Sequence, residues 1–502
     1  MFKTLQNTWP KDSDLPDRAH RLQMLTRVLD GSLYDKLKYS FHQETSPAQE
    51  YVPLRDRRPS VRYRLCKLVV DDSISLLFSE GHFPDIETDD ELTKESIQSL
   101  AKEMTLNEVM IDAATRGAVG SAAVLLQVFD SRPFISVLDT ALLTPIWKPR
   151  APDTLLRVEE RYKVLGHDLK DAGYAIKESD LQADFWFARD WTESDEVWYL
   201  PLLVSEAKKN KTFKVDAQKS INHKLGFVPI VWIKNLPGGD AIDGSPTLPN
   251  DAIDTSIEID YQLSQAGRGL KYSSDPTLLL KEPAVSEGNI VKGAGNAIVV
   301  GADGDGKMLE INGTAAQAVI EYVRLLRELA IESMHGNRAN TEKQTSAPSG
   351  KALEMMNQSL IWLADKLRIS YGEKGLIELL NMLVKAHHKV NFLLKNGEKL
   401  SPFAEKTVIT LRWPSWYAST MQDMLDRAQT LVTLTTSGLM SRLTAIKVLS
   451  SEYDIEDVAA EKLMADAEMK EAALMNKPAV RTKQTIFKDS NQMMTGSEEE
   501  TK

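Results

Sequence analysis

The sequence predicts an α+β protein of several domains, and three observations point to this class. The chain has 502 residues, which is longer than one hydrophobic core usually serves. Between about residues 122 and 234 apolar and polar residues alternate in short runs, as they do in half-buried strands. On both sides of that stretch apolar residues recur every three or four positions, which is the period of an α-helix. Helices therefore come first, and a mostly antiparallel sheet is expected to follow them.

The first 60 or so residues are mainly polar, and five prolines interrupt the short helices expected there. A helix is expected over 60–79, with Ser60 as its N-cap, and a second helix over 92–116. Gly117 and Gly120 then separate these helices from the strands. The strands are expected at 122–129, 134–138, 143–147, 155–164, 184–189, 196–203 and 228–234.

The middle of the chain predicts two helices joined by a small β module. A loop rich in Gly, Pro and Asp covers 236–250, and helices are expected over 250–271 and 315–334. If these helices are antiparallel neighbours, the β module lies at the far end of a helical stalk. The same spacing also fits an ordinary α+β domain with a β-hairpin insertion. The short strands of the module are expected at 277–280, 296–300 and 307–311.

An irregular segment is expected over 335–349, because it is rich in small polar residues and has no apolar period. A long helical stretch follows over 350–394, with interruptions near Gly372 and Gly375. Residues 477–502 are expected to form a mobile, charged tail.

The region before that tail carries the clearest punctuation in the chain. A short strand ends at Pro414, and a helix with apolar residues on one face follows it. Gly438 ends that helix and Ser441 caps the next one, which is expected to end near Tyr453. A third helix begins at the acidic residues near Glu456.

Composition restricts the function. A net charge of −11 argues against a protein that coats DNA, because binding to phosphates needs a basic surface. It is compatible with a passage through which DNA slides without adhering. Cys66 is the only cysteine, so neither an intrachain disulfide nor a cysteine-based metal cluster is expected. Residues 1–13 do not resemble a signal peptide, and no run of about 18 apolar residues predicts a membrane span.

Residues 301–307 match the spacing Gly-x-x-x-x-Gly-Lys of a phosphate-binding loop. Met308 stands where such a loop carries a hydroxyl for Mg²⁺, and 308–311 alternate like a strand instead of opening a helix. A Gly- and Asp-rich hairpin turn is therefore expected here. The same turn lacks the first ligand and the bidentate glutamate of a calcium loop, so no calcium site is expected.

No catalytic, cofactor or metal site is predicted, and the protein is not expected to be an enzyme. His387 and His388 are adjacent, so on a helix they point about 100° apart and cannot hold one metal ion together. A surface or interface role is expected for both. Ser121 lacks the following glycine of a nucleophile elbow. The acidic group over 85–91 is expected to be a solvated loop and helix start.

The densest basic group is expected to form salt bridges to neighbouring subunits, with contact to phosphates as the alternative. Arg64 and Lys67 would share one face of the helix over 60–79. The members of the group are Arg55, Arg57, Arg58, Arg62, Arg64 and Lys67.

The run over 411–449, in which strand, helix, Ser-Gly-Leu-Met-Ser and helix follow one another, resembles the C-terminal part of bacteriophage portal proteins. The run Ser-Gly-Lys-Ala-Leu at 349–353 is similar to the start of the family's long helix. The resemblance covers about 55–470 and rests on the order of the elements. It implies a wing at 1–249 and 350–414, stem helices at 250–271 and 315–334, a clip at 272–314, a tunnel loop at 335–349, a crown at 415–476 and a flexible tail at 477–502.

The resemblance also implies a function. Portal proteins form a ring, expected here to be a dodecamer, at one capsid vertex of the virion, and double-stranded DNA is packaged and ejected through it without sequence specificity. The implied partners are the terminase large subunit, which hydrolyses ATP, the major capsid and scaffold proteins, and a head–tail adaptor, with assembly in the host cytoplasm and no membrane. The DNA-facing candidates on the tunnel loop are Arg338, Asn340, Lys343 and Gln344.

Two other classes stay open at this point. One is a nucleotide-binding enzyme that works through the degenerate phosphate loop at 301–307. The other is a non-channel oligomeric scaffold or baseplate component, which would share the helices and have no central hole.

Overall fold

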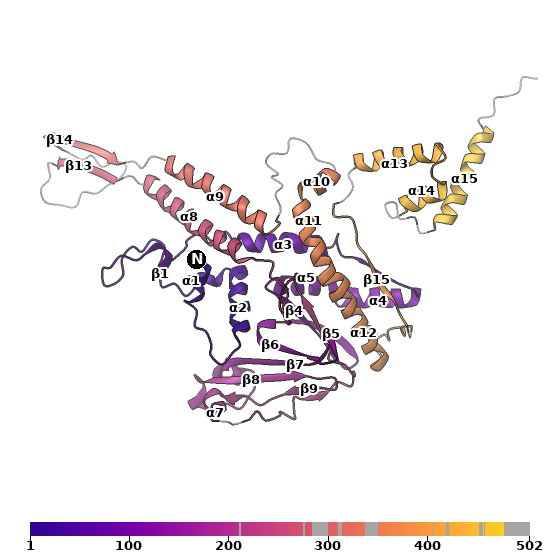
Figure 1. Cartoon of the computed structure of the whole chain (residues 1–502), viewed down its shortest axis with the longest axis horizontal. Coiled ribbons are helices and arrows are strands. Elements are labelled where there is room, and N and C mark those ends of the chain that lie inside the picture. Colours follow the sequence, from indigo (N-terminus) through magenta and orange to yellow (C-terminus); the bar gives the residue numbers. More distant parts are fainter. Residues whose placement is uncertain are drawn as a thin grey trace, which may run out of the picture. The chain divides into compact units, whose positions relative to one another are not determined.

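The computed structural model describes residues 1–209, 212–274, 277–283, 300–309, 314–336, 350–404, 406–417, 421–450, 455 and 457–475. The chain divides into two compact units, Met1–Ala418 and Ser419–Lys502. Helices and strands are both abundant, so the α+β prediction is confirmed (Figure 1).

The helices at the start of the first unit form one wall of its core. Their apolar faces bury side chains such as Leu22, Leu77 and Met110. A two-stranded parallel pair, β1 (Tyr39–Ser40) and β2 (Arg57–Arg58), lies between them in sequence. The helices are α1 (Phe2–Gln6), α2 (Asp17–Asp30), α3 (Leu65–Phe78), α4 (Glu91–Glu103) and α5 (Leu106–Gly117).

Two details of this region differ from the prediction. Ser60 is not an N-cap, because α3 begins only after Arg64, whose φ is 53°. The backbone before it donates its amides to helix α8 (Asn250–Ser274) instead, from Val61 to Ser264 Oγ at 3.0 Å and from Tyr63 to Asp260 Oδ1 at 2.7 Å. The single helix expected over 92–116 is two helices, because Thr105 between α4 and α5 is left-handed with φ 46°.

Two antiparallel sheets follow, and most predicted strands are confirmed with small changes at their ends. One sheet has the order β12-β4-β5, and the other has the order β11-β9-β8-β7-β6 with β10 beside β8. Helices α6 (Gly166–Asp171) and α7 (Val204–Ala207) lie in its connections. The strands are β4 (Ser121–Phe129), β5 (Arg132–Leu138), β6 (Leu143–Lys148), β7 (Ala151–Leu165), β8 (Asp184–Trp191), β9 (Asp195–Trp198), β10 (Leu202–Leu203), β11 (Ile221–Asn222) and β12 (Ile230–Lys234). The single strand expected over 196–203 is instead two strands, β9 and β10, which both pair with β8.

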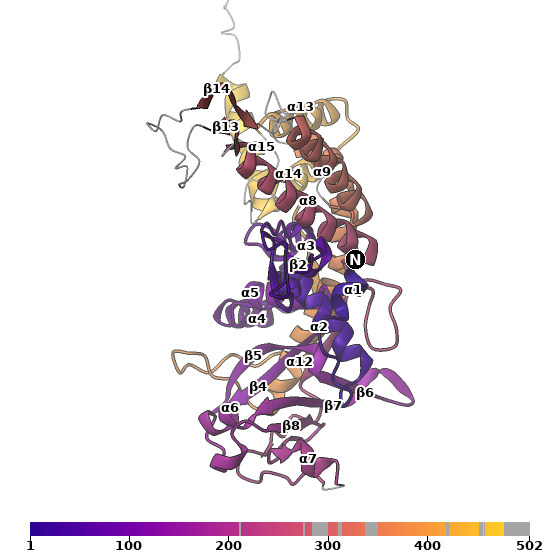
Figure 2. The same ribbon diagram turned by 90° about the vertical axis from the view of Figure 1, so that its left-hand side faces the viewer.

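Strand β4 is buried on both faces and joins the layers of the unit. Ala122, Val124 and Leu126 belong to the large core cluster beneath the helices. The alternate residues Ala123 and Leu125 belong to a second cluster shared with the larger sheet. Since successive side chains of a strand point to opposite faces, the three-stranded sheet is the middle layer between helices and larger sheet (Figure 2).

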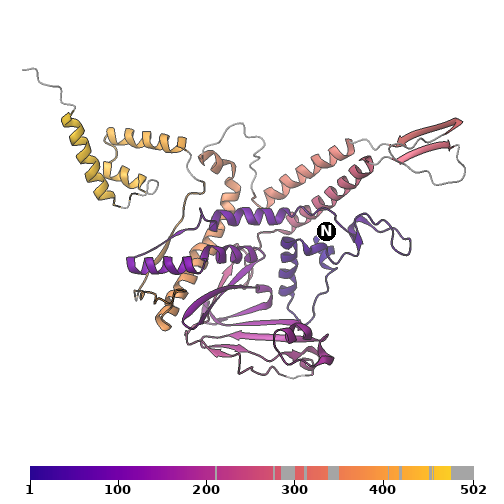
Figure 3. The ribbon, with the colours of Figure 1, turned by 180° about the vertical axis from the view of Figure 1, so that it is seen from behind.

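The long helical stretch is α10 (Gly350–Met356), α11 (Gln358–Leu367), a π-helical segment (Arg368–Leu376) and α12 (Ile377–Lys389). The interruption expected near Gly372 and Gly375 is this π segment. The stretch ends at Lys389, a few residues before the predicted end at 394. Helix α11 packs against α3 (Figure 3). Beyond it, β15 (Ile409–Arg412) pairs antiparallel with β3 (Asp85–Thr88).

The second unit contains α13 (Met421–Thr436), α14 (Arg442–Leu449) and α15 (Val458–Met475). The predicted punctuation is confirmed here: Gly438 is left-handed with φ 74°, and the Ser441 side chain accepts a hydrogen bond from the Thr444 amide. Asp457 caps α15 by accepting from the Ala459 amide at 2.9 Å.

Candidate functional site

The two middle helices run side by side and carry a β ribbon at their far end (Figure 1). They are α8 (Asn250–Ser274) and α9 (Thr314–Ser333), and the strands between them are β13 (Thr277–Pro283) and β14 (Val300–Leu309). Both helices occupy the places that the sequence predicts. This stalk is the part of the described chain in which long helices leave the core, and it is therefore the candidate functional element.

The root of the stalk is fixed by buried polar contacts. Asp260 of α8 is buried and accepts hydrogen bonds from Tyr34 Oη at 2.8 Å and from the Tyr63 amide at 2.7 Å. Burial raises the pKa of the Asp260 carboxyl to about 6, and the Tyr63 amide and Tyr34 hydroxyl oppose this rise. The first half of α8 also buries Ile253 and Ile257 in the core.

Helix α9 uses one face for packing and leaves another open. Val323 and Leu326 pack against the core cluster that α8 contributes to. Tyr322, Leu325 and Leu329 recur at helical spacing on a neighbouring face, and they are 44%, 52% and 52% exposed. A stripe of large apolar side chains that faces water in a single chain indicates a surface for contact with another molecule.

The segment with the phosphate-loop spacing is a strand, so the hairpin turn predicted there is wrong. β14 covers 300–309 as one strand and pairs with β13, with Gly306 opposite Leu280 and Lys307 opposite Leu279, and the register shifts between Asp305 and Val300. Gly and Asp disfavour strands locally, and pairing with β13 overrides that preference. Because β14 continues through Met308 and Leu309, where a phosphate loop would open a helix, this segment lacks the geometry of a phosphate loop.

The four predicted DNA-facing residues, Arg338, Asn340, Lys343 and Gln344, lie outside the described residues, as does most of the segment over 335–349. The described residues fix where that segment starts. Gly336 donates its amide to Ile331 O at 2.8 Å and lies so close to α3 that an added Cβ would be 2.9 Å from Val69 Cγ2. The segment therefore leaves the end of α9 against α3 and returns at α10.

Three members of the predicted basic group have partners within the chain, and the burial of Arg57 makes the expected subunit salt bridge wrong for that residue. For the other members it stays a prediction. Arg57 is buried and donates to Val52 O at 2.9 Å. Arg62 binds Asp35 at 3.0 Å, and Lys67 binds Asp71 at 2.9 Å. Arg64 lies before α3, so it shares no helix face with Lys67. Arg55, Arg58 and Arg64 are exposed.

Two further expectations need correction. His387 is buried in the core, where its Nδ1 accepts from the Phe392 amide at 2.9 Å and its ring packs against Phe403, so the surface role is wrong for it. Burial lowers the pKa of the His387 imidazole. The acidic group over 85–91 is only partly solvated loop, because Asp85 and Glu87 belong to β3 and pair with Arg412.

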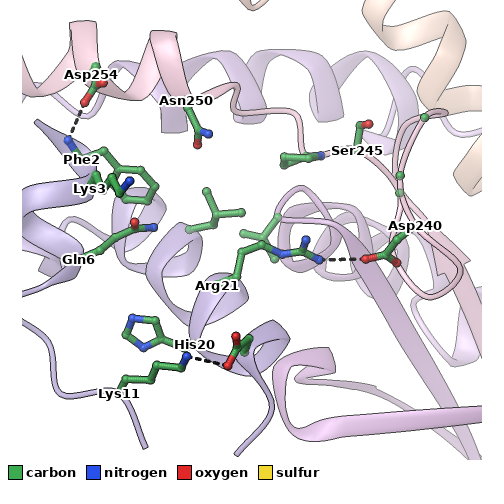
Figure 4. A pocket seen from close by; sticks show the side chains of 17 residues that line it. Phe2, Lys3, Gln6, Lys11, His20, Arg21, Asp240, Ser245, Asn250 and Asp254 are labelled. Carbon is green, nitrogen blue, oxygen red and sulfur yellow. Dashed lines mark hydrogen bonds and ion pairs between the residues drawn. The ribbon is translucent and has the colours of Figure 1, made fainter.

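A cavity of about 890 Å³ lies beside the N-terminus, between α1, α2 and the loop before α8 (Figure 4). The charged groups around it pair with one another. Lys11 binds Asp17 at 2.6 Å, and Arg21 binds Asp240 at 3.2 Å. The N-terminal ammonium binds Asp254 at 2.9 Å. Such a set of satisfied ion pairs holds the segment together and offers no acid–base pair aimed at a substrate.

The site that sequence reasoning missed is a buried stack around the π segment. The Arg368 guanidinium lies over the rings of Trp416 and Trp413, which follow β15. Among the described atoms Arg368 Nε has no hydrogen-bond partner, and burial lowers the pKa of the guanidinium to about 10. Two signals in the sequence point to this region, namely the glycines that interrupt the long helix and the two tryptophans. Neither signal shows that Arg368 is the cation that stacks on the tryptophan rings.

The described residues also bear on two other kinds of feature, metal sites and membrane-spanning helices. Among the described residues no group of three or more His, Cys, Asp or Glu side chains is placed to hold a metal ion. In the same residues no helix has the length and apolar character that crossing a membrane requires.

A helical stalk tipped by a β ribbon, with an exposed apolar stripe on α9, indicates a protein that assembles with other molecules (Figure 1). The family model described as phage portal protein, SPP1 Gp6-like, matches residues 56–473. The chain belongs to this phage portal protein family, whose members are structural components of the phage particle.

Two other comparisons complete the picture. No curated protein matches this chain. One similar solved chain comes from the virion of a native gene transfer agent particle, with 10% identity and a TM-score of 0.34, covering 77% of this chain and 89% of that chain.

Proposed function

We propose that this protein forms a closed ring at one vertex of the phage capsid and that double-stranded DNA passes through the ring during packaging and ejection. The proposal rests on the family match over 56–473 together with the open apolar stripe on α9. A ring of identical copies covers such a stripe, since each copy presents one face and receives another. Twelve copies are the number that the portal resemblance implies.

In this proposal the stalk of α8 and α9 is the stem, and residues 272–314 at its tip are the clip. The first unit without the stalk is the wing, 335–349 is the tunnel loop, 415–476 is the crown, and 477–502 is the tail. The terminase large subunit and a head–tail adaptor dock on the ring, and major capsid and scaffold proteins surround it. Assembly takes place in the host cytoplasm, and the finished ring resides in the virion.

The proposed channel is weakly adhesive. The net charge of −11 repels phosphates, and this repulsion favours sliding over binding. Arg338 and Lys343, with the polar side chains of Asn340 and Gln344, supply local and transient contacts to the DNA backbone without sequence specificity. Each such contact is screened by salt.

The ring is tested on the purified full-length chain by light scattering and negative-stain imaging. The expected result is a particle of high mass with a central hole. Particles without a hole would favour the non-channel scaffold, and a stable monomer at micromolar concentration would contradict both.

A further inference from the structure

The second unit has little core of its own. In its described residues the buried apolar side chains are Leu431 and Ala445. Units of this size hold together only when they bury a larger share of their apolar surface or gain a partner. Eight of its large apolar side chains are exposed instead: Met421, Leu425, Val432, Leu439, Leu443, Leu463, Met464 and Met469.

Part of this exposed surface forms a stripe on α13. Met421, Leu425, Ala428 and Val432 recur at intervals of four, three and four residues, which places them along one face of the helix. Met421 is 79% exposed and Leu425 is 58% exposed. The buried apolar side chain of α13, Leu431, lies outside this stripe.

A second stripe lies on α15. Ala460, Leu463, Met464 and Ala467 have the spacing of three, one and three residues that forms one helix face. Leu463 is 71% exposed. Arg442 of α14 binds α15 at Asp466, which is not part of this stripe, at 3.0 Å.

Within one copy the two stripes are held apart. α14 packs against α13 and against α15, and the large apolar side chains of both stripes are exposed in the single chain. The helices have matching lengths, roughly 24 Å for α13 and roughly 27 Å for α15 at about 1.5 Å per residue. One helix therefore has the length and the apolar spacing to cover the other in a neighbouring molecule.

We propose that the α13 stripe of one copy packs against the α15 stripe of the next copy, so that the second units join head to tail. The occupant of each stripe is thus a second copy of this chain. Two different faces on one unit give a heterologous contact, and such contacts close into a ring or continue as a filament. This inference rests on the proposed ring and adds the surface through which the second units join.

The cysteine content of the chain allows a direct test. Cys66 is the only cysteine and is buried, and burial raises the pKa of its thiol to about 12, so the unmodified protein reacts poorly with maleimides. Full-length variants Leu425→Cys, Leu463→Cys and the double variant are assembled and treated with a short bismaleimide. Denaturing gels of the double variant are expected to show a ladder of multiples of the chain. Each single variant is expected to remain monomeric on the gel.

The other outcomes overturn the inference in distinct ways. Dimers from Leu425→Cys alone would show that α13 stripes meet each other. A cross-linked band at monomer size in the double variant would show that one chain covers its own stripes. If the double variant forms rings but gives no cross-link, the α13–α15 contact is contradicted and the proposal of a ring is unaffected. If the unmodified protein forms no ring or filament, the proposed function itself fails.

A charge substitution gives a second measure with a matched control. Leu425→Glu places a carboxylate in the stripe, and Thr430→Glu places the same charge on an exposed polar position of the same helix, about 140° around the helix axis from Leu425. In the Leu425→Glu variant we expect the second units of neighbouring copies to separate from one another. This separation would appear as at least tenfold faster proteolysis within 419–475 of the assembled protein. The Thr430→Glu variant is expected to resemble the unmodified protein. Equal rates for both variants would contradict the proposal.

Discussion

The guanidinium of Arg368 lies 3.2 Å from the ring centroid of Trp416, and the ring of Trp413 lies 4.7 Å from the same group. Arg368 begins the π-helical segment, whereas both tryptophans follow β15 about 45 residues later. The extra width of a π turn brings Gly372 against Trp413, where an added Cβ would be 2.2 Å from Cζ2. The stack therefore locks the long helix to the last strand of the first unit.

Arg368→Lys is expected to lower the stability of the first unit by about 2 kcal/mol, because a lysine ammonium cannot stack in the place of a planar guanidinium. Urea unfolding followed by tryptophan fluorescence measures the loss. The control is Arg412→Lys, since Arg412 is exposed and its pairing with Asp85 is a surface salt bridge worth less than about 1 kcal/mol. Equal losses in the two variants would show that the stack is not stabilising.

Two glycine substitutions are expected to act in opposite directions. Gly117→Ala places a Cβ 2.0 Å from Tyr371 Oη, which donates to Asn235 Oδ1 in the core, so a loss of about 1–3 kcal/mol is expected. Gly267→Ala lies on α8, where nothing is within 4 Å of the new carbon, and a gain of up to about 1 kcal/mol in helix stability is expected. Thermal unfolding of both variants checks the signs. A stabilising Gly117→Ala would show that Tyr371 moves freely.

Asp260 is expected to make stability fall as pH rises from about 4 to about 6. Its folded pKa is raised from 3.8 to about 6, so in this window the folded chain holds a proton that the unfolded chain has released. The contribution is therefore present at low pH and lost as pH passes 6, with an upper limit of roughly 3 kcal/mol. Asp260→Asn keeps an acceptor for the Tyr63 amide and removes the titration. Unfolding midpoints of the two proteins should diverge with pH, and parallel curves would contradict the assignment.

Charge removal on the proposed tunnel loop is expected to affect DNA and not assembly. Arg338→Gln combined with Lys343→Gln removes the two positive groups that suit sliding contact with phosphates. The length of packaged DNA is expected to fall, while sizing and imaging show unchanged rings. Normal packaging would remove the DNA role of these residues. Loss of rings with a folded monomer would make the segment an interface.

ATP is expected not to bind at 301–307, because these residues belong to strand β14, which continues to Leu309 where a phosphate loop would open a helix. Isothermal calorimetry with Mg²⁺ and ATP on the full chain checks this. Tight binding that Lys307→Ala abolishes would reopen the enzyme interpretation.

The regions that sequence reasoning predicts well are those in which local signals and tertiary contacts agree. β4 is a short and nearly continuous apolar run and is buried on both faces, and Gly438 and Ser441 act where a stop and a cap are expected. The helices of the stalk follow from their apolar period alone. Each of these features depends on neighbours in the sequence.

The errors arise where a distant partner overrides the local signal. Ser60 has the chemistry of an N-cap, but the amides that follow it are taken by Ser264 and Asp260 about 200 residues away. The Gly–Asp run at 301–306 is a good turn sequence, and β13 makes it a strand. The sequence around His387 suggests a surface histidine, but in the fold Phe392 and Phe403 pack against it. No local pattern encodes these contacts.

The pairing of β3 with β15 also determines how long β3 remains without its partner while the chain is synthesised. Thr88 and Ile409 are partners, and about 320 positions separate them. At a synthesis rate of about 5–20 residues per second, β3 waits on the order of 15–65 s for its partner to leave the ribosome. During that interval its edge is unpaired, and the carboxylates of Asp85 and Glu87 discourage association with other strands. The acidic residues thus protect the nascent chain before Arg412 arrives to neutralise them.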